Sequence, residues 1–328
     1  MSLCSICPRK CAADRAKAPG YCGAREKAHI ARAALHRWEE PIISGERGSG
    51  TIFFCGCNLN CIFCQNYKIN HSVMGIEADE ETLCRIMLDL QHQGAHNINL
   101  VTPAPHVPLI ARTLPLARQA GLTIPVVYNT NAYENVQTLK MLEGLIDIYL
   151  PDFKYVSAPL AKKYSDAEDY FAIAAQAIAE MYRQVGNIKL DENGMATSGV
   201  LIRHMVLPGC VDDTRRVLDY ISANYPKNVY ISIMSQYAPP KDDLPKPINR
   251  RITKGEYDRA LDYAISKGFE NVFIQQRNSA DLSYTPDFDA DVIFDPITRA
   301  LNRQNKGKYE RIINFSNIYL KMIAKRNI

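Results

Sequence analysis

Short apolar runs alternate with longer amphipathic stretches along most of this chain, and this alternation limits the folds open to it. Seven runs have the length of a strand, at residues 51–55, 97–101, 124–128, 146–150, 200–206, 229–234 and 272–275. Helical patterns lie near residues 79–93, 107–119, 134–144, 167–185, 211–224 and 254–267. Strands joined by helices run parallel, so the pattern predicts an α/β protein with a parallel sheet. Seven such units indicate a full or partial β/α barrel, with a doubly wound open sheet as the alternative.

The chain divides by composition into three segments. Residues 1–50 are rich in cysteine, arginine and lysine and end in the glycine-rich residues 44–50, which indicates a Cys-rich, metal-binding extension. We expect the barrel over residues 51–280 and a helical C-terminal extension over residues 281–328, a total length that one barrel accommodates. The net charge of +4 is too small to indicate a nucleic-acid partner.

The expected location of the protein bears on how its cysteines are interpreted. No apolar run reaches the roughly 20 residues that span a bilayer, and the N-terminus lacks the features of a signal peptide, so we expect a cytoplasmic protein without a membrane partner. Thiols stay reduced in that compartment. Because eight of the ten cysteines lie before residue 65, they are predicted to be metal ligands rather than disulfide partners.

Polar residues gather directly after the predicted strands, at 57–64, 102–103, 129–131, 152–154, 208–209 and 235–236. The carboxyl ends of parallel strands form the active site in barrels and open sheets alike, so these residues predict a catalytic face. Cys57, Cys61 and Cys64 follow the first strand with the spacing Cys-x3-Cys-x2-Cys. Three such thiolates hold three irons of a 4Fe–4S cluster and leave the fourth open to a substrate or cofactor. A zinc loop closed by Cys55, or a chance group of buried thiols, is the alternative.

The segment 54–66, Phe-Cys-Gly-Cys-Asn-Leu-Asn-Cys-Ile-Phe-Cys-Gln-Asn, resembles the cluster loop of radical S-adenosylmethionine enzymes. It is most similar to the branch of pyruvate formate-lyase activating enzymes whose members carry Cys-Pro-x-x-Cys near the start, here residues 7–11. The resemblance implies a β/α barrel and S-adenosylmethionine on the open iron. It also implies reductive cleavage to methionine and a 5′-deoxyadenosyl radical, with electrons from a reductant such as flavodoxin or ferredoxin.

The resemblance continues downstream. Residues 129–131, Asn-Thr-Asn, resemble the Asp-Thr-Asn-Gly segment of glycyl-radical activating enzymes, with Asn129 in place of the acid, and residues 152–154 resemble their Asp-x-Lys. Arg203 with residues 207–209 resembles their Arg…Pro-Gly stretch. The family's Gly-Gly-Glu segment is absent, and residues 101–106, Val-Thr-Pro-Ala-Pro-His, stand in its place. The residues expected to bind the cofactor are Phe63, Asn66, Thr102, Asn129, Asn131, Asp152, Lys154, Arg203 and Gln236.

A second cysteine set lies at the N-terminus, where Cys4, Cys7, Cys11 and Cys22 have the spacing Cys-x2-Cys-x3-Cys-x10-Cys. The segment is too short for a core of its own, and a bound metal would supply the missing folding free energy. Zinc is the first choice, and a second iron–sulfur cluster or unligated thiols are the alternatives. Cys84 and Cys210 are expected to be packed thiols, and His106 and His204 to be structural.

Three functions remain open from the sequence. The first is an activating enzyme that abstracts hydrogen from a glycine in an exposed loop of a protein partner. The second is a radical enzyme acting on another peptide, a small molecule or a nucleic acid. The third is a non-catalytic protein with a fully ligated iron–sulfur cluster or zinc, and it leaves Asp152 and Lys154 unexplained.

Overall fold

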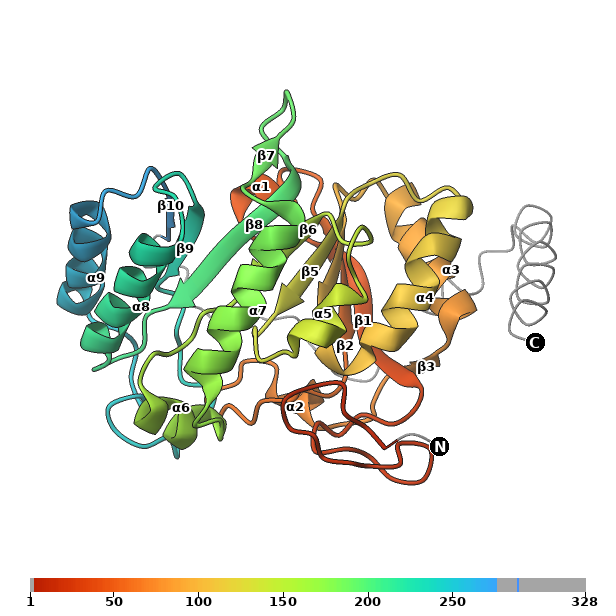
Figure 1. Cartoon of the computed structure of the whole chain (residues 1–328), viewed down its shortest axis with the longest axis horizontal. Helices are drawn as coiled ribbons and strands as arrows, with labels where there is room; N and C mark the ends of the chain where they lie inside the picture. Colours follow the sequence, from red (N-terminus) through yellow and green to blue (C-terminus); the bar gives the residue numbers. More distant parts are fainter. Residues whose placement is uncertain (1–2, 276–287, 289–328) are drawn as a thin grey trace.

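The computed structural model describes residues 3–275 and Phe288, and its centre is a ten-stranded sheet (Figure 1). The strand order is β10-β9-β8-β6-β5-β4-β2-β1-β3, with β7 paired to β8. The strands are β1 (Ala28–His36), β2 (Ser49–Phe54), β3 (Ile76–Ala78), β4 (Ile98–Val101), β5 (Val126–Thr130), β6 (Ile148–Pro151), β7 (Lys189–Leu190), β8 (Ala196–Met205), β9 (Tyr230–Met234) and β10 (Asn271–Ile274). The seven predicted strands form the parallel part of this sheet, from β2 to β10.

Helices connect the parallel strands, and the long ones lie together on one side of the sheet (Figure 1). The helices are α1 (Pro41–Ser44), α2 (Tyr67–Asn70), α3 (Glu80–His92), η1 (Ala104–His106), α4 (Val107–Gln119), α5 (Val136–Lys140), α6 (Ala158–Ser165), α7 (Tyr170–Val185), α8 (Val211–Asn224) and α9 (Lys254–Ser266). Within the described residues the strand order runs open from β10 to β3. The architecture is therefore a partial β/α barrel, as predicted, rather than a sheet with helices on both faces.

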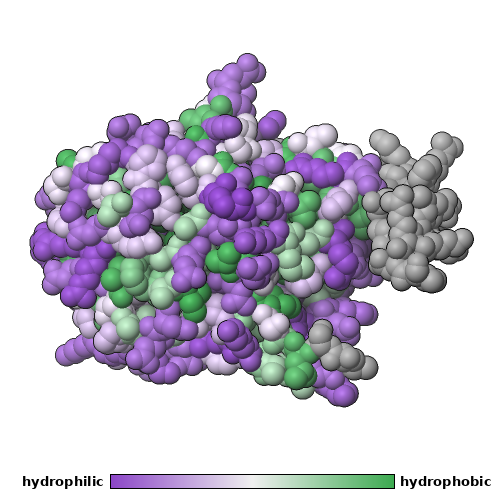
Figure 2. All heavy atoms as spheres, in the orientation of Figure 1, coloured by the Kyte–Doolittle hydropathy of each residue, from purple (hydrophilic) through white to green (hydrophobic). Residues whose placement is uncertain are grey.

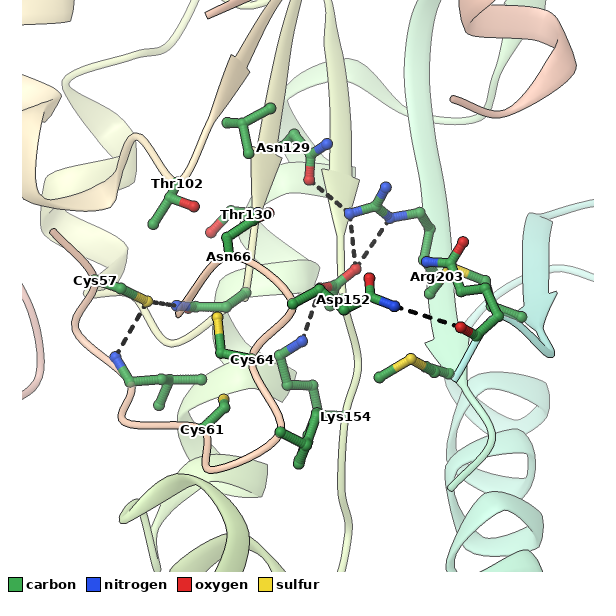
Figure 3. A pocket seen from close by; sticks show the side chains of 18 of the residues that line it. Cys57, Cys61, Cys64, Asn66, Thr102, Asn129, Thr130, Asp152, Lys154 and Arg203 are labelled. Atoms are coloured by element: carbon green, nitrogen blue, oxygen red, sulfur yellow. Dashed lines mark hydrogen bonds and ion pairs between the residues drawn. The ribbon is translucent and has the colours of Figure 1, made fainter. Parts of the chain in front are cut away.

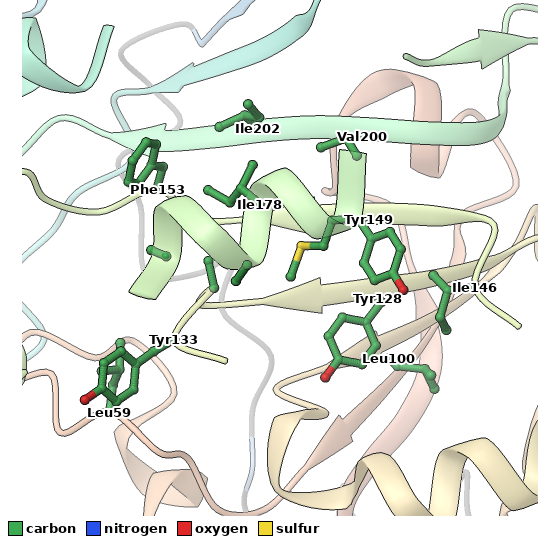
Figure 4. Close-up of a cluster of buried hydrophobic side chains, with 14 of the residues drawn as sticks. Leu59, Leu100, Tyr128, Tyr133, Ile146, Tyr149, Phe153, Ile178, Val200 and Ile202 are labelled. Carbon is green, nitrogen blue, oxygen red and sulfur yellow. The ribbon is translucent and has the colours of Figure 1, made fainter. Parts of the chain in front are cut away.

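Buried side chains on both faces of the sheet hold the strands in position. Side chains alternate across the sheet, so one set packs against the helices and the other faces the barrel interior. Tyr149 and Ile202 pack with Ile178 of α7 on the helical side (Figure 4). Val127 and Leu201 belong to a second cluster on the interior side. Both faces of these strands are buried, which fixes where their carboxyl ends, and the polar residues after them, are placed.

The structure differs from the sequence prediction at several places. The predicted extension 1–50 divides in two, because β1 pairs antiparallel with β2 and belongs to the main sheet. Residues 3–27, named the knuckle below, lie outside regular secondary structure at the lower edge of Figure 1. The predicted helix 134–144 is only α5, since Met141–Leu145 form turns. Helix α6 and strands β3 and β7 are short and were not predicted.

The surface, the helices and the C-terminal segment each add one observation. The face shown in Figure 2 is mostly hydrophilic, with hydrophobic residues interspersed over the helices. No helix among the described residues combines the length and apolarity needed to cross a membrane. The predicted C-terminal extension 281–328 lies outside the described residues apart from Phe288.

Candidate active site

A cavity of about 250 Å³ opens at the carboxyl ends of the parallel strands. It is lined by every residue predicted to hold the cluster or the cofactor: Cys57, Cys61, Cys64, Phe63, Asn66, Thr102, Asn129, Asn131, Asp152, Lys154, Arg203 and Gln236. The residues labelled in Figure 3 come from segments far apart in the sequence. Strand pairing produces this convergence, since Asn129 of β5 pairs with Val101 of β4 and Leu150 of β6.

The cluster loop, residues 55–66, carries three thiols into this cavity. The backbone N–H of Leu59 and the side-chain amide of Asn131 donate to Cys57 Sγ over 3.5 and 3.3 Å. Cys61 Sγ lies 3.0 Å from Ser165 Oγ. Burial, with the neighbouring Cys61 thiol, raises the pKa of Cys57 to about 12. The thiols are therefore protonated at neutral pH unless a bound metal ion displaces the protons.

An ionic network forms the wall opposite the thiols. Lys154 Nζ donates to Asp152 Oδ2 over 2.8 Å, and Arg203 Nε donates to Asp152 Oδ1 over 3.0 Å. Burial alone would raise the pKa of Asp152, but the Arg203 and Lys154 cations outweigh it and hold that pKa below its ordinary value. An isolated bridge between Asp152 and Arg203 extends the pairing of β6 and β8, so the sheet aligns this pair. The network presents an ionised carboxylate and two cations to any ligand of the cavity.

Glu39 is a cavity residue that sequence reasoning missed. Its carboxylate accepts from Arg203 Nη1 over 3.2 Å and from Asn129 Nδ2 over 3.5 Å. Glu39 lies between β1 and α1, before the first parallel strand, and carries no motif that could have revealed it. It brings a second carboxylate into a cavity whose sequence lacks the family's Gly-Gly-Glu segment.

Three other predicted cavity residues are held in different ways, by a backbone conformation, by ring contacts and by a hydrogen bond. Thr102 has a φ of 58°, a left-handed conformation that is strained for a β-branched residue. Phe63 is buried and makes edge contacts with the rings of Tyr164 and Tyr237. Gln236 accepts at its backbone oxygen from the side chain of Gln65 over 3.4 Å, which ties it to the cluster loop. His36, Trp38, Met205 and Met234 also line the cavity and were not predicted.

Several other polar residues turn away from the cavity. The Cys55 thiol donates to the carbonyl of Met74 over 3.0 Å, so it does not face the three cluster-loop thiols. His106 lies 3.0 Å from the carbonyl of Cys55, and His204 bridges the Phe153 carbonyl and Thr214 Oγ1. Burial lowers the pKa of His106 to about 3 and that of His204 to about 4, which keeps both neutral. Cys84 and Cys210 pack against the hydrophobic core.

The chain is similar to several known proteins. A family model described as the radical SAM superfamily matches residues 51–275. An uncharacterized protein of Methanocaldococcus jannaschii is 32% identical over 272 residues, which cover 80% of this chain and 74% of that protein. The crystal structure of Streptococcus suis SuiB bound to S-adenosylmethionine is 13% identical with a TM-score of 0.45, over 67% of this chain and 45% of that chain. HydG, a maturase of the FeFe-hydrogenase, is 14% identical with a TM-score of 0.46, over 74% of this chain and 52% of that chain.

Proposed function

The chain belongs to the radical SAM superfamily, and on that premise we propose that it is an activating enzyme that removes a hydrogen atom from a glycine of a protein partner. The family implies a 4Fe–4S cluster and S-adenosylmethionine as cofactors. When reduced, the bound cluster supplies the electron that cleaves S-adenosylmethionine to methionine and a 5′-deoxyadenosyl radical. The proposal includes a cytoplasmic location and a reductant such as flavodoxin or ferredoxin.

The residues present fit these two cofactors. Three thiols of the cluster loop face the cavity, while the thiol of Cys55, at the start of the same loop, is hydrogen-bonded to Met74. Cys57, Cys61 and Cys64 would therefore hold three irons and leave the fourth open. The cavity beside them combines carboxylates and cations with the buried ring of Phe63, a lining suited to a ligand with an amino-acid end and an aromatic base.

Each side chain has a definite task in this proposal. Asp152, held ionised by Arg203 and Lys154, accepts hydrogen bonds from the ligand, and the two cations orient its anionic groups. In the family that the sequence resembles, the Gly-Gly-Glu segment binds the amine of the methionyl group. Glu39, which accepts from Arg203 in the cavity, receives that ammonium group in this proposal. Asn131 orients Cys57 through its amide. The apolar side chains of Leu59, Phe63 and Leu207 limit the access of water, which a carbon radical requires.

The single observation that carries the enzymatic part is the position of Asp152, Lys154 and Arg203 in the same cavity as the three thiols. A protein with a closed electron-transfer cluster has no use for such a site. The test is anaerobic reconstitution with iron and sulfide, reduction with dithionite, addition of S-adenosylmethionine and assay of 5′-deoxyadenosine. The wild type and Cys84→Ala should form the product, and Cys61→Ala should not. Product formation by Cys61→Ala would contradict the assignment of the cluster.

The glycine substrate is tested separately. A short peptide with one central glycine, deuterated at Cα, is added to the reduced enzyme with S-adenosylmethionine. Deuterium in the 5′-deoxyadenosine, absent with an otherwise identical alanine-centred peptide, supports hydrogen abstraction from glycine. Cleavage of S-adenosylmethionine without deuterium transfer favours the second candidate, a radical enzyme for another substrate. The replacement of Gly-Gly-Glu by residues 101–106 is the observation that keeps that candidate.

A further inference from the structure

The knuckle, residues 3–27, is the part of the described chain that the proposed function does not use. It contains no regular helix or strand, and its only buried residues are Cys7, Cys22 and Ala24. Three apolar side chains cannot form a core that orders 25 residues of chain. Another source of stabilisation is required, and two of the three buried residues are cysteines.

The four knuckle cysteines converge on one another. Gly20 lies between two of them, so that a Cβ atom on it would stand 3.3 Å from Cys11 Sγ and 3.6 Å from Cys22 Sγ. The backbone brings Cys4 beside Cys11, because the N–H of Cys4 donates to the carbonyl of Ala13 over 3.0 Å. Cys7 belongs to the same turn, since the N–H of Lys10 donates to its carbonyl over 3.1 Å. The segment thus brings four cysteines from 19 residues of sequence into one short turn region. A side chain at position 20 would press on Cys11 Sγ, which a glycine avoids.

The turn that carries Cys11 has an uncommon backbone conformation. Lys10 and Ala12, on both sides of Cys11, have φ values of 43° and 50°. This strained turn is stable only if something holds its ends together.

We propose that Cys4, Cys7, Cys11 and Cys22 bind one zinc ion, and that the knuckle closed by this ion holds the cluster loop in place. A zinc tetrathiolate has Zn–S bonds of about 2.3 Å, which puts the sulfur atoms about 3.8 Å apart. A single ion needs sulfur atoms close together, and a Cβ atom on Gly20 would contact those of both Cys11 and Cys22. An iron–sulfur cube attaches each thiolate to a different iron and holds the sulfur atoms farther apart.

Folding and metal binding are coupled in this proposal. Among the described residues, no group of three or more His, Cys, Asp or Glu side chains stands at metal-binding distances, and this holds for Cys57, Cys61 and Cys64 as well. Binding of the ion would draw the knuckle thiolates together, and its binding free energy would contribute to folding.

Two contacts connect the knuckle to the cluster loop. The N–H of Cys57 donates to the carbonyl of Cys22 over 3.0 Å, which joins a residue of one cysteine set to a residue of the other. Arg9 Nε donates to the carbonyl of Asn58 over 2.8 Å, and its Nη1 donates to the carbonyl of Asp166 over 2.6 Å. Cys22 is itself one of the proposed ligands, and Arg9 lies two residues from both Cys7 and Cys11. Closure of the metal site therefore fixes both contacts.

Metal analysis is the first test, performed on the full chain. In the triple variant C57S/C61S/C64S no cluster forms in the barrel, and we expect one zinc ion per chain. Adding C4S/C7S should remove the zinc, whereas adding C84S should not. Cobalt in place of zinc should give the ligand-field band of a tetrahedral tetrathiolate. About four irons per chain in the triple variant after reconstitution would overturn zinc in favour of a second cluster, and the absence of both metals would overturn the site.

Hydrogen exchange tests the coupling. In the same triple variant, removal of zinc with a chelator should speed exchange of the amides of residues 55–66 by at least about tenfold, because the Cys57–Cys22 hydrogen bond is lost. Exchange in α9 should not change, and added zinc should restore protection. Restoration excludes irreversible misfolding as the cause. Equal exchange with and without zinc would overturn the claim that the ion holds the loop.

Discussion

The cluster loop and the knuckle are both cysteine-rich, and they differ in what holds them. The cluster loop follows β2, in the middle of a sheet whose strands are buried on both faces, so its thiols are placed by the barrel. The knuckle has no core and no regular secondary structure. The same residue type is thus positioned by a hydrophobic core in one region and, in our proposal, by a metal ion in the other. Four substitutions test this account, two in the barrel and two where the cluster loop and the knuckle meet.

The largest effect is expected from Asp152→Asn, which breaks the network that the sheet aligns. The change leaves Arg203 and Lys154 without a charged partner at Asp152, and removing one member of a largely buried ion network costs about 3–5 kcal/mol. The dissociation constant for S-adenosylmethionine should rise at least tenfold. Chemical unfolding and equilibrium dialysis measure the two effects. Zinc content should stay unchanged, and Asp258→Asn, at an exposed ion pair of α9, should have neither effect.

A pH-dependent effect is expected at Glu134, which is buried beside Tyr128 and Thr130. Burial raises the pKa of Glu134 from its ordinary 4.5 to about 7. Between those values the folded state keeps a proton that the unfolded state has lost, so stability falls as the pH rises, by about 3 kcal/mol in all. Glu134→Gln should remove this fall. The stability of the variant relative to the wild type should therefore be higher at pH 8 than at pH 4.5. Unfolding midpoints that show the same pH dependence in both proteins would contradict this account.

A smaller effect is expected where the two regions meet, at Gly56. Its φ is 90°, and a Cβ atom there would lie 2.9 Å from the carbonyl oxygen of Cys22. Gly94 has a φ of 92° with no atom within 4 Å, so Gly94→Ala measures the backbone strain alone. Gly56→Ala should destabilise the protein by about 1–2 kcal/mol more than Gly94→Ala, because the overpacking displaces the knuckle. Equal losses would show that the knuckle does not press on the cluster loop.

The smallest effect is expected from Arg9→Ala. The guanidinium bonds two carbonyls across the junction and lies 4.2 Å from the centre of the Tyr21 ring. Its loss should cost about 1–2 kcal/mol, the range for hydrogen bonds from a charged donor. Arg25→Ala removes the same charge from an exposed site of the knuckle and should cost less than about 0.5 kcal/mol. Thermal unfolding of the wild type, Arg9→Ala and Arg25→Ala checks the order.

The success of the sequence prediction varied with the kind of signal. The seven parallel strands and helices α4 and α8 were predicted closely, because buried elements carry a strong apolar period. Strand β1 was missed since its apolar positions are mostly alanines mixed with arginine and histidine. Helix α5 was overestimated because the turns that follow it, at residues 141–145, begin with Met-Leu-Glu, which are residues that favour helices.

The sequence by itself determined the superfamily and the α/β class with its parallel strands, and it predicted the three cluster-loop cysteines as ligands, because motif spacing and apolar periodicity are local properties of the chain. Only the tertiary structure decided which side chains share the cavity. It excluded Cys55, which bonds to Met74, and it brought in Glu39, more than 160 residues from its partner Arg203. It also joined Cys22 of the knuckle to Cys57 of the cluster loop. Contacts between distant segments depend on how the strands pair in space, and no local pattern records that pairing.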